Sequence, residues 1–549
     1  MNSIARRDRY EDIYGAFSWN IPARYNIATD VCDRHADADD TRVALIGEDS
    51  AGKTWTMSFR HVQRQANRLA NLLVSLGLQR GDRVMLLMVQ DPWVAIGHIA
   101  CWKAGLVSLP CSVLFGPDAV AYRLDHAGVR VVITDSANLP KVIEARDKAP
   151  SVEKVFLVDG ADAQAEHLDK ALEPARDAFT TVDTGADDPA FFNFTSGTTG
   201  NPKGALQPHR SMLGHLPGLE FMFEFFPQPR DVMWSPADWA WLAGLMAVLM
   251  PAWYHGVPVV TSRAMRFDPD QACALMARHQ VRTALLTPTA LRMMRQVKDP
   301  LAMGVDLRVV LSGGEAVGKE LHEWAGATLK TTINEGFGQT ECNLVLGNCA
   351  SVMPVRPGSL GRPAPGHVCA IVDDQGRELK AGEIGHIAVR RPDPVMMLEY
   401  WNNPKATAEK YIGDWLITGD LGSVDDDGYF WFQGRADDII TSSGYRIGPT
   451  EIEDALTRHP AVMLAAVVGV PDPVRTESIK AFLVLRKDFV ASPELVEEIR
   501  GFVRERLAKH EVPREIEFLD ALPMTTTGKV LRRELRDAEK KKVADGGGA

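Results

Sequence analysis

The chain has 549 residues, more than one hydrophobic core usually organises, so we expect two or more domains. Its formal net charge is -11, from 61 Lys and Arg and 72 Asp and Glu residues. This acidic balance argues against a nucleic-acid partner, because nonspecific binding of nucleic acid needs a basic footprint.

Helical and strand patterns alternate in the first part of the chain. Ser58 is placed to cap a helix whose apolar residues recur with helical spacing up to Leu73, and Gly77 is placed to end it. Pro92 suits the first turn of the next helix, and Gly105 can close that helix. We expect buried strands at 84–89, 129–134, 282–286 and 307–311. The alternation predicts an α/β domain with parallel-rich sheets covered by helices.

The longest apolar run, 239–254, lies between these strands. It is interrupted by Pro251 and is too short to span a bilayer. We therefore expect a buried helix there and no membrane span.

The last part of the chain reads as a small α+β domain of roughly a hundred residues, a common domain size. The polar segment 434–438, flanked by predicted strands, is a candidate hinge. A helix opened by Pro449 follows, then strands at 462–468 and 479–485 and a helix over 493–509. The tail 539–549 carries three lysines and a glycine run, so we expect it to be disordered. These patterns predict two domains, 1–436 and 437–549.

A loop rich in hydroxyl and glycine residues follows a predicted strand at 190–194. Small residues let the backbone approach an oligophosphate, whose oxygens can accept from the loop's N–H groups and hydroxyls, and Lys203 adds a positive charge. A plain surface turn does not require such a run followed by a lysine. The common nucleoside-triphosphate spacing GxxxxGK[ST] is absent, which argues against kinase-like and GTPase-like readings. The candidate phosphate-binding residues are Thr195, Ser196, Gly197, Thr198, Thr199, Gly200 and Lys203.

Further motifs follow this loop in a fixed order. They are Ser-Gly-Gly-Glu at 312–315, Asn-Glu-Gly-Phe-Gly-Gln-Thr-Glu at 334–341, Thr-Gly-Asp at 418–420, the segment 434–438, Ser-Gly-Tyr-Arg at 443–446, and 523–529. With these motifs, essentially the whole chain resembles the acyl-adenylate-forming superfamily of acyl-CoA synthetases, luciferases and peptide-synthetase adenylation domains. The segments 434–449 and 471–475 most resemble medium-chain acyl-CoA synthetases.

The resemblance implies a reaction in two halves. A carboxylic acid attacks the α-phosphate of MgATP to give acyl-AMP and pyrophosphate, and the CoA thiol then takes the acyl group. Lys529, with Thr340 and Glu341, is implied to be catalytic, and Glu341 to be the magnesium ligand; a structural ion pair is the alternative for Glu341. The small domain is implied to be a mobile lid that rotates about a hinge at Asp437 between the two halves.

The resemblance also implies the binding residues. Besides the phosphate loop, the ATP site would include Gly314, Glu315, Ala316, Glu335, Gly336, Phe337, Gly338, Gln339, Thr340, Asp420, Arg435 and Lys529. CoA would contact Ser443, Gly444, Tyr445 and Arg475. The acid would contact Trp239, Trp241, Gly338, Thr340 and Arg446. A surface salt bridge is the alternative for Asp420 and Arg435, and ordinary core packing is the alternative for the two tryptophans.

The predicted acid follows from the same pocket. Gly338 stands where acetate-specific relatives carry a tryptophan that shortens the pocket, so we expect room for more than acetate. Trp239 and Trp241 would limit the depth, and together these residues favour a medium-chain, branched or aromatic acid. We also expect Gly338→Trp to shift preference toward shorter acids. Asp238 in this segment resembles the aspartate that holds an amino group in amino-acid-activating relatives, although CoA synthetases share it.

Three alternative functions are considered. A stand-alone adenylation enzyme would load a carrier protein, although no carrier domain follows in this chain. A luciferase-type oxidase could use the same scaffold. A catalytically inactive nucleotide-binding module would have lost catalytic positions, but these are present. The predicted partners are a carboxylic acid, ATP and CoA, and an oligomer is compatible with the sequence. Seven scattered cysteines without a CxxC pair argue against disulfides or zinc and are typical of a cytoplasmic protein.

Overall fold

A computed structural model of the chain describes residues 3–49, 52–195, 202–264, 266–315, 317–436, 438, 440–442, 445–472, 475–508, 511–524 and 530–546. The chain divides into two compact units. The first comprises Met1–Cys369 and Val389–Leu416, and the second Ala370–Ala388 and Ile417–Ala549. The predicted boundary after residue 436 stays a prediction.

One sheet of the first unit is mainly parallel, as predicted. Its central strands β8, β4, β3, β5, β6 and β7 run parallel, while β9 and β19 are antiparallel additions at one edge. In sheet order, the strands are β19 (Glu399–Tyr400), β9 (Lys203–Pro208), β8 (Pro189–Thr195), β4 (Val107–Pro110), β3 (Arg83–Leu87), β5 (Val129–Thr134), β6 (Lys154–Leu157) and β7 (Glu166–His167).

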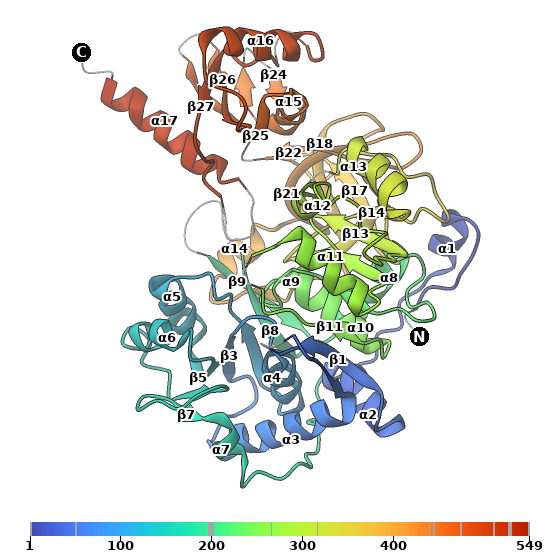
Figure 1. Ribbon diagram of the computed structural model, residues 1–549, viewed down its shortest axis with the longest axis vertical. Helices are drawn as coiled ribbons and strands as arrows, with labels where there is room; N and C mark the ends of the chain where they lie inside the picture. The colour runs from blue at the N-terminus through green and yellow to red at the C-terminus, as the bar shows by residue number, and fades with distance from the viewer. Residues whose placement is uncertain are drawn as a thin grey trace. The chain divides into compact units, whose positions relative to one another are not determined.

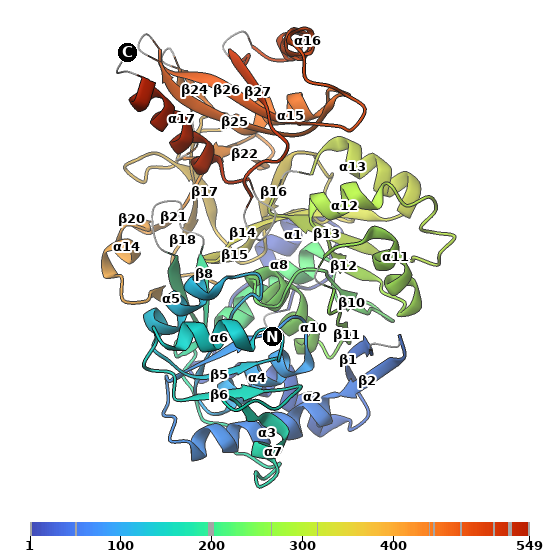
Figure 2. The ribbon, with the colours of Figure 1, turned by 60° about the vertical axis from the view of Figure 1, so that its left-hand side comes forward.

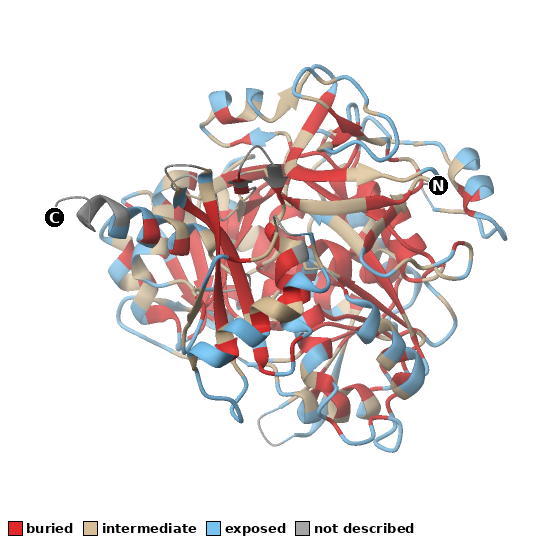
Figure 3. Cartoon of the chain, turned by 90° about the horizontal axis from the view of Figure 1, so that it is seen from above, coloured by how far each residue is buried: buried red, intermediate tan, exposed pale blue. Residues whose placement is uncertain are grey.

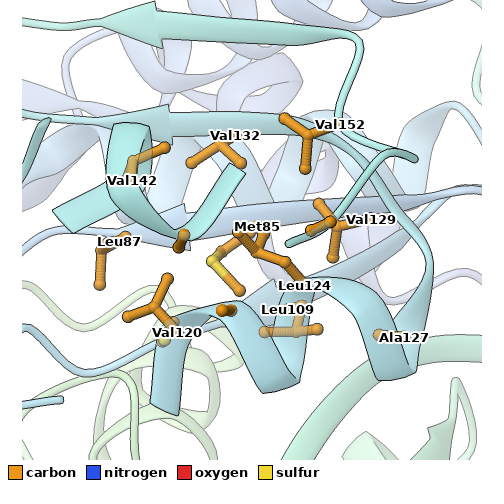
Figure 4. Packing of buried hydrophobic residues seen from close by; sticks show 14 of the residues in the cluster. Met85, Leu87, Leu109, Val120, Leu124, Ala127, Val129, Val132, Val142 and Val152 are labelled. Atoms are coloured by element: carbon orange, nitrogen blue, oxygen red, sulfur yellow. The ribbon is translucent and has the colours of Figure 1, made fainter. Parts of the chain in front are cut away.

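Helices cover both faces of this sheet. Met85 and Leu87 of β3 point to one face, where they pack with Val120 and Leu124 of α5 (Pro117–Ala127) and with residues of α6 (Leu139–Arg146) (Figures 1 and 4). Leu86 points to the other face because side chains alternate along a strand, and there it meets Gly97 of α4 (Pro92–Lys103). In the same region α3 (Phe59–Ser75) packs on α4.

The second sheet of the first unit is parallel at its centre and antiparallel at both ends. Its strands in order are β16 (Ser359–Pro363), β15 (Cys342–Gly347), β14 (Thr332–Gln339), β13 (Val309–Gly313), β12 (Thr283–Leu285), β10 (Met233–Trp234), β11 (Val259–Val260), β1 (Val43–Glu48) and β2 (Thr54–Ser58).

The other helices of this unit are α1 (Tyr10–Ala16), α2 (Arg34–Ala38), α7 (Leu168–Leu172), α8 (Ser211–Met222), α9 (Leu242–Gly244), α10 (Met250–Tyr254), α11 (Pro269–Arg278), α12 (Pro288–Met294), α13 (Lys319–Trp324) and α14 (Pro404–Ala408), with π-helical turns at Thr29–Asp33, Leu245–Leu249 and Ala325–Leu329. Most strands are buried, whereas many helices keep one exposed face (Figure 3).

Local signals placed the ends of α3 correctly. The Ser58 hydroxyl accepts from the backbone N–H of His61, as a helix N-cap does, and Gly77 follows the helix with a φ of +83°. The apolar run 239–254 is helical only from Leu242, where α9 begins, so the predicted helix starts too early. No helix in the part of the chain that the structure describes combines the length and hydropathy of a membrane span.

The second unit contains a small α+β sheet, as predicted. The long hairpin of β25 (Val462–Asp472) and β26 (Thr476–Leu485) is flanked by β23 (Ile440–Ser442) with β24 (Tyr445–Ile447) and by β27 (Glu515–Phe518). The helices α15 (Pro449–Thr457) and α16 (Pro493–Arg504) pack with it around Ile452, Leu456 and Ile499. Four more strands belong to this part of the chain: β17 (Cys369–Val372), β18 (Gly385–Arg390), β21 (Trp415–Val424), which pairs with β20 (Tyr411–Ile412), and β22 (Phe430–Arg435). Gly434 and Arg435 therefore end a strand and are not part of a loop.

The C-terminal tail corrects one expectation. Residues predicted to be disordered form the end of α17 (Arg532–Gly546), which lies beside β25 (Figure 2). The cause is a buried cation: Lys480 of β26 is 6% exposed, and its ammonium lies 2.9 Å from Glu539 and 2.7 Å from Glu517. Lys542 also pairs with Glu539 at 2.7 Å. The tail charges therefore attach the helix to the sheet.

None of the seven cysteines, all of them among the described residues, is joined in a disulfide. Six are buried and Cys369 is partly exposed. Groups of three or more potential metal-ligating His, Cys, Asp or Glu side chains do not occur among the described residues.

Candidate active site

The predicted phosphate loop connects β8 to β9. These strands are antiparallel, with Thr195 opposite Lys203, and the Thr195 hydroxyl lies 3.4 Å from the Lys203 carbonyl oxygen. The closed base of the hairpin thus holds two predicted phosphate ligands next to each other. Ser196, Gly197, Thr198, Thr199 and Gly200 lie outside the described residues.

Helix α5 supports both sides of this hairpin. The Tyr122 hydroxyl donates to the Pro202 carbonyl at 3.0 Å, and the rings of Tyr122 and His126 contact the ring of Phe194. The buried Arg123 guanidinium lies 5.2 Å from the centre of the same Phe194 ring. The strands that enter and leave the loop are therefore fixed by a single helix.

The second candidate element is the hairpin of β14 and β15. Thr340 and Glu341 form a two-residue turn between Gln339 and Cys342, which are paired, and the register shifts just before the turn. The Gln207 side chain donates to the Thr340 carbonyl at 2.7 Å, and Lys410 contacts the Gln339 side chain at 2.9 Å. The tip of the hairpin is held by side chains from other segments.

Gly338 is needed for the shape of this hairpin. A Cβ atom built on Gly338 would lie 2.3 Å from the backbone nitrogen of Leu344 and 2.8 Å from the Cα of Asn343. Because both neighbours are backbone, a side chain cannot be accommodated without moving the strand. The expectation that Gly338→Trp shifts preference toward shorter acids stays a prediction, and we also expect that change to distort the hairpin.

Glu341 is held through both its backbone and its side chain. The Met397 backbone N–H donates to the Glu341 carbonyl at 3.0 Å, and the Tyr400 hydroxyl donates to the Oε1 atom of the Glu341 carboxylate. Within the described residues the carboxylate makes no ion pair, and its Oε2 atom has no hydrogen-bond partner. The alternative of a structural ion pair thus has no support there. One anchored carboxylate with an open oxygen fits Mg²⁺, which uses few protein carboxylates together with phosphate oxygens.

The loop after β13 was predicted to bind adenine. It begins with Gly314, whose φ is +85°, and the Glu315 carboxylate contacts Thr289 at 3.1 Å and Arg292 at 3.3 Å. It follows the carboxyl end of a parallel strand, where open α/β sheets bind ligands. Ala316, a predicted member of this loop, lies outside the described residues.

Glu335 has partners within the protein. It is buried on β14, and its carboxylate accepts from His322 at 3.1 Å and from the backbone N–H of Val317 at 3.3 Å. Burial raises the pKa of Glu335, and the hydrogen bond from His322 opposes that rise. Its side chain thereby fixes the end of the loop that follows Gly314. Gly336 and Phe337 continue the same strand and are both partly exposed.

The two tryptophans of the predicted acyl-pocket segment differ in their exposure to solvent. Trp239 is 1% exposed, as the core-packing alternative expects. Trp241 is partly exposed, and its ring meets that of Phe115 edge-on at 5.8 Å. Asp238, which precedes Trp239, accepts from the Ser112 hydroxyl at 3.2 Å, and burial raises the pKa of Asp238.

In the second unit, Asp420 and Arg435 are brought together. They stand opposite each other on β21 and β22, with 3.0 Å between the carboxylate and the guanidinium. Gly419, with a φ of +83°, lies against the Arg435 guanidinium. Asp420 is 6% exposed, whereas the Arg435 side chain is 38% exposed, so the surface salt bridge considered from the sequence describes the arginine but not the aspartate.

Described neighbours of the predicted CoA residues pair across the small sheet. Ser442 of β23, which precedes Ser443, pairs with Thr476 of β26, which follows Arg475. The Arg475 side chain pairs with Asp472 at 3.3 Å. Ser443 and Gly444 lie outside the described residues, as do the side chains of Tyr445 and Arg446.

Lys529 and Asp437 also lie outside the described residues, but their neighbours are described. Met524 and Val530, which flank residues 525–529, form a β-bridge. Asp438 forms ion pairs with Arg532 at 3.5 Å and Arg536 at 2.8 Å, both on α17. The residue after the predicted hinge is thus tied to the helix that follows the Lys529 segment.

Sequence reasoning missed Tyr400, Gln207 and Tyr122. Tyr400 and Gln207 contact candidate residues that are distant in the sequence, Tyr122 contacts residues beside the phosphate loop, and no local motif marks any of the three. His209 and His215, to which no role was given, are buried; His209 accepts from the Ile27 N–H, and His215 donates to the Ser211 carbonyl.

Comparison with known proteins identifies the family. The model of the AMP-binding enzyme family matches residues 32–401, and that of the AMP-binding enzyme C-terminal domain matches residues 451–529. The chain therefore belongs to the AMP-binding enzymes, as its motifs predicted.

Similarity to individual relatives shows which class of enzyme within this family the chain represents. The chain is 36% identical to acetyl-coenzyme A synthetase of Bacillus subtilis (strain 168), over 96% of this chain and 94% of that protein. It is 35% identical to the mitochondrial acyl-coenzyme A synthetase ACSM3 of Rattus norvegicus, over 96% and 93% of the two chains. The fold is similar to that of the anthranilate CoA ligase AuaEII in complex with anthranoyl-AMP, with a TM-score of 0.88, 29% identity, and 95% and 99% of the two chains covered. Within its family the chain is an AMP-forming acid–thiol ligase, the class predicted to use ATP, Mg²⁺, CoA and a carboxylic acid.

Proposed function

We propose that this acyl-CoA synthetase acts in the cytoplasm on a medium-chain, branched or aromatic carboxylic acid. The observation that carries the choice of acid is Trp241, a partly exposed ring packed against Phe115 in the predicted acyl-pocket segment. Flat apolar walls of this kind suit an aromatic or medium-length apolar acid. The anthranoyl-AMP complex of a relative with the same fold supports an aromatic acid.

We assign the first half-reaction to the two hairpins of the first unit. Lys203 and Thr195 bind the phosphates, and Glu341 holds Mg²⁺, which neutralises phosphate charge when bound. Thr340 orients the acid, while Glu335 acts indirectly by fixing the loop of Gly314 and Glu315. Asp420 accepts from the ribose hydroxyls, Arg435 contacts the ribose–phosphate side, and Lys529 stabilises the charge that develops as the acid attacks.

For the second half-reaction, we assign CoA to the turn of Ser443, Gly444 and Tyr445 together with Arg475. The pairing of Ser442 with Thr476 supports this assignment because Ser442 precedes Ser443 and Thr476 follows Arg475. Asp437 is the proposed hinge, and Arg446 is placed near the acyl end.

The test is pyrophosphate release across acids from acetate through dodecanoate, with benzoate, in the presence and absence of CoA. We expect the highest kcat/KM for medium-chain or aromatic acids, and acyl-CoA as the product when CoA is present. A preference for acetate would contradict the choice of acid. Pyrophosphate release without any thioester on free CoA would instead favour the alternative, a stand-alone adenylation enzyme that loads a carrier protein.

A further inference from the structure

Tyr400 touches two candidate residues that come from different hairpins. Its hydroxyl donates to the Glu341 carboxylate at the tip of the β14–β15 hairpin. Its ring lies under the Lys203 ammonium, 5.2 Å from the ring centre, at the base of the phosphate hairpin. One side chain therefore connects the predicted metal ligand to the predicted phosphate-binding cation.

The position of Tyr400 is itself fixed by its surroundings. Tyr400 is 4% exposed and packs with Ala205, Met397 and Ala406. On β19 it pairs with Ala205 of β9, and its backbone N–H donates to the Thr407 hydroxyl at 2.9 Å. Its backbone therefore belongs to the same sheet as Lys203, and its ring is enclosed by neighbouring side chains.

We propose that Tyr400 is a positioning residue that aligns Glu341 and Lys203 for MgATP. The hydroxyl holds Oε1 and so aims Oε2 of the carboxylate, the atom without a hydrogen-bond partner among the described residues, at the metal. The ring meanwhile holds the ammonium of Lys203 by a cation–π contact. This inference rests on the proposed function, in which Glu341 binds Mg²⁺ and Lys203 binds phosphate.

The structure offers a matched control at Tyr10. Tyr10 is also 4% exposed, and its hydroxyl donates a hydrogen bond to the Pro363 carbonyl at 2.8 Å. Tyr10→Phe and Tyr400→Phe thus remove equivalent groups, but only Tyr400 contacts candidate site residues.

The test measures Mn²⁺ binding, from the electron paramagnetic resonance signal of free Mn²⁺, in the presence of a non-hydrolysable ATP analogue. We expect Tyr400→Phe to raise the Kd of Mn²⁺ by about tenfold or more, the usual effect of losing a partner of a metal ligand. Tyr10→Phe should leave it unchanged. Tyr400→Leu, which also removes the ring under Lys203, should in addition weaken binding of the analogue without metal.

A further variant, Glu341→Gln, tests the metal role of Glu341 separately from the positioning role of Tyr400. If Glu341→Gln weakens Mn²⁺ binding while Tyr400→Phe behaves like Tyr10→Phe, the positioning role of Tyr400 is wrong and the metal role of Glu341 stands. If Glu341→Gln has no effect, both the metal assignment and the inference are overturned. Thermal unfolding of each variant shows whether its fold is intact.

Discussion

At the scale of single residues, Lys529 separates the two half-reactions. We expect Lys529→Ala to slow adenylate formation by about a hundredfold or more, because it removes a charge that stabilises the transition state. Thioester formation from supplied acyl-AMP should be retained, since that step does not need the attack on phosphorus. Pyrophosphate release and acyl-CoA formation, assayed separately, measure the two effects. Lys541→Ala, at an exposed lysine of α17, is the control. Equal loss of both half-reactions would contradict the role.

Trp241 tests the depth of the acyl pocket. We expect Trp241→Ala to raise kcat/KM for dodecanoate relative to hexanoate by about tenfold, because a shortened wall accommodates additional methylenes. Trp324→Ala, at another partly buried tryptophan in a different apolar cluster, should leave this ratio unchanged. An unchanged ratio in Trp241→Ala would place the acyl chain elsewhere.

At the scale of elements, one buried cation helps to hold α17 against the sheet. We expect Glu539→Ala to lower the free energy of unfolding by about 2 kcal/mol, the order of a hydrogen bond to a charged group, because it leaves Lys480 with fewer partners. Glu534→Ala, at an exposed position of the same helix, should change it little. Urea unfolding monitored by circular dichroism compares the two. Equal stability of both variants would show that α17 is held by other contacts.

Elements with local signals could be predicted, and those that depend on distant residues could not. The N-cap of α3 and the strand β5 follow from residues within the element. The helical tail, by contrast, depends on Lys480, which is far away in the sequence. The same contrast applies to the candidate site. Sequence motifs predicted Glu341 and Lys203, but no motif predicted Tyr400, which contacts both of them. Gly338 shows a related limit: a missing side chain suggested an open pocket, whereas the structure shows a close approach of backbone.

At the scale of the whole molecule, buried histidines predict a loss of stability in acid. Burial lowers the pKa of His98 and His209 to about 3 and that of His215 to about 4, below the ordinary value of 6.5. Below pH 6.5 the unfolded chain takes up protons that the folded protein resists, so stability falls as the pH falls from about 6.5 toward 4. Each unit of pKa difference corresponds to about 1.4 kcal/mol.

Thermal unfolding at pH 7.5, 6 and 5 measures this effect. We expect the unfolding temperature to fall as the pH is lowered. The slope of unfolding temperature against pH should be smaller in His209→Gln. His167→Gln, at a partly exposed histidine of β7, should keep the original slope. Identical slopes in all three proteins would assign the acid sensitivity to carboxyl groups.

The burial of the native thiols has a practical consequence. Burial raises the pKa of Cys32, Cys101, Cys111, Cys273, Cys349 and Cys369, and the thiolate is the form that reacts with maleimides. A single cysteine introduced at an exposed position such as Glu534 would therefore react far faster than the native ones. One fluorescent dye attached there would report on the second unit during turnover, with every native cysteine left in place.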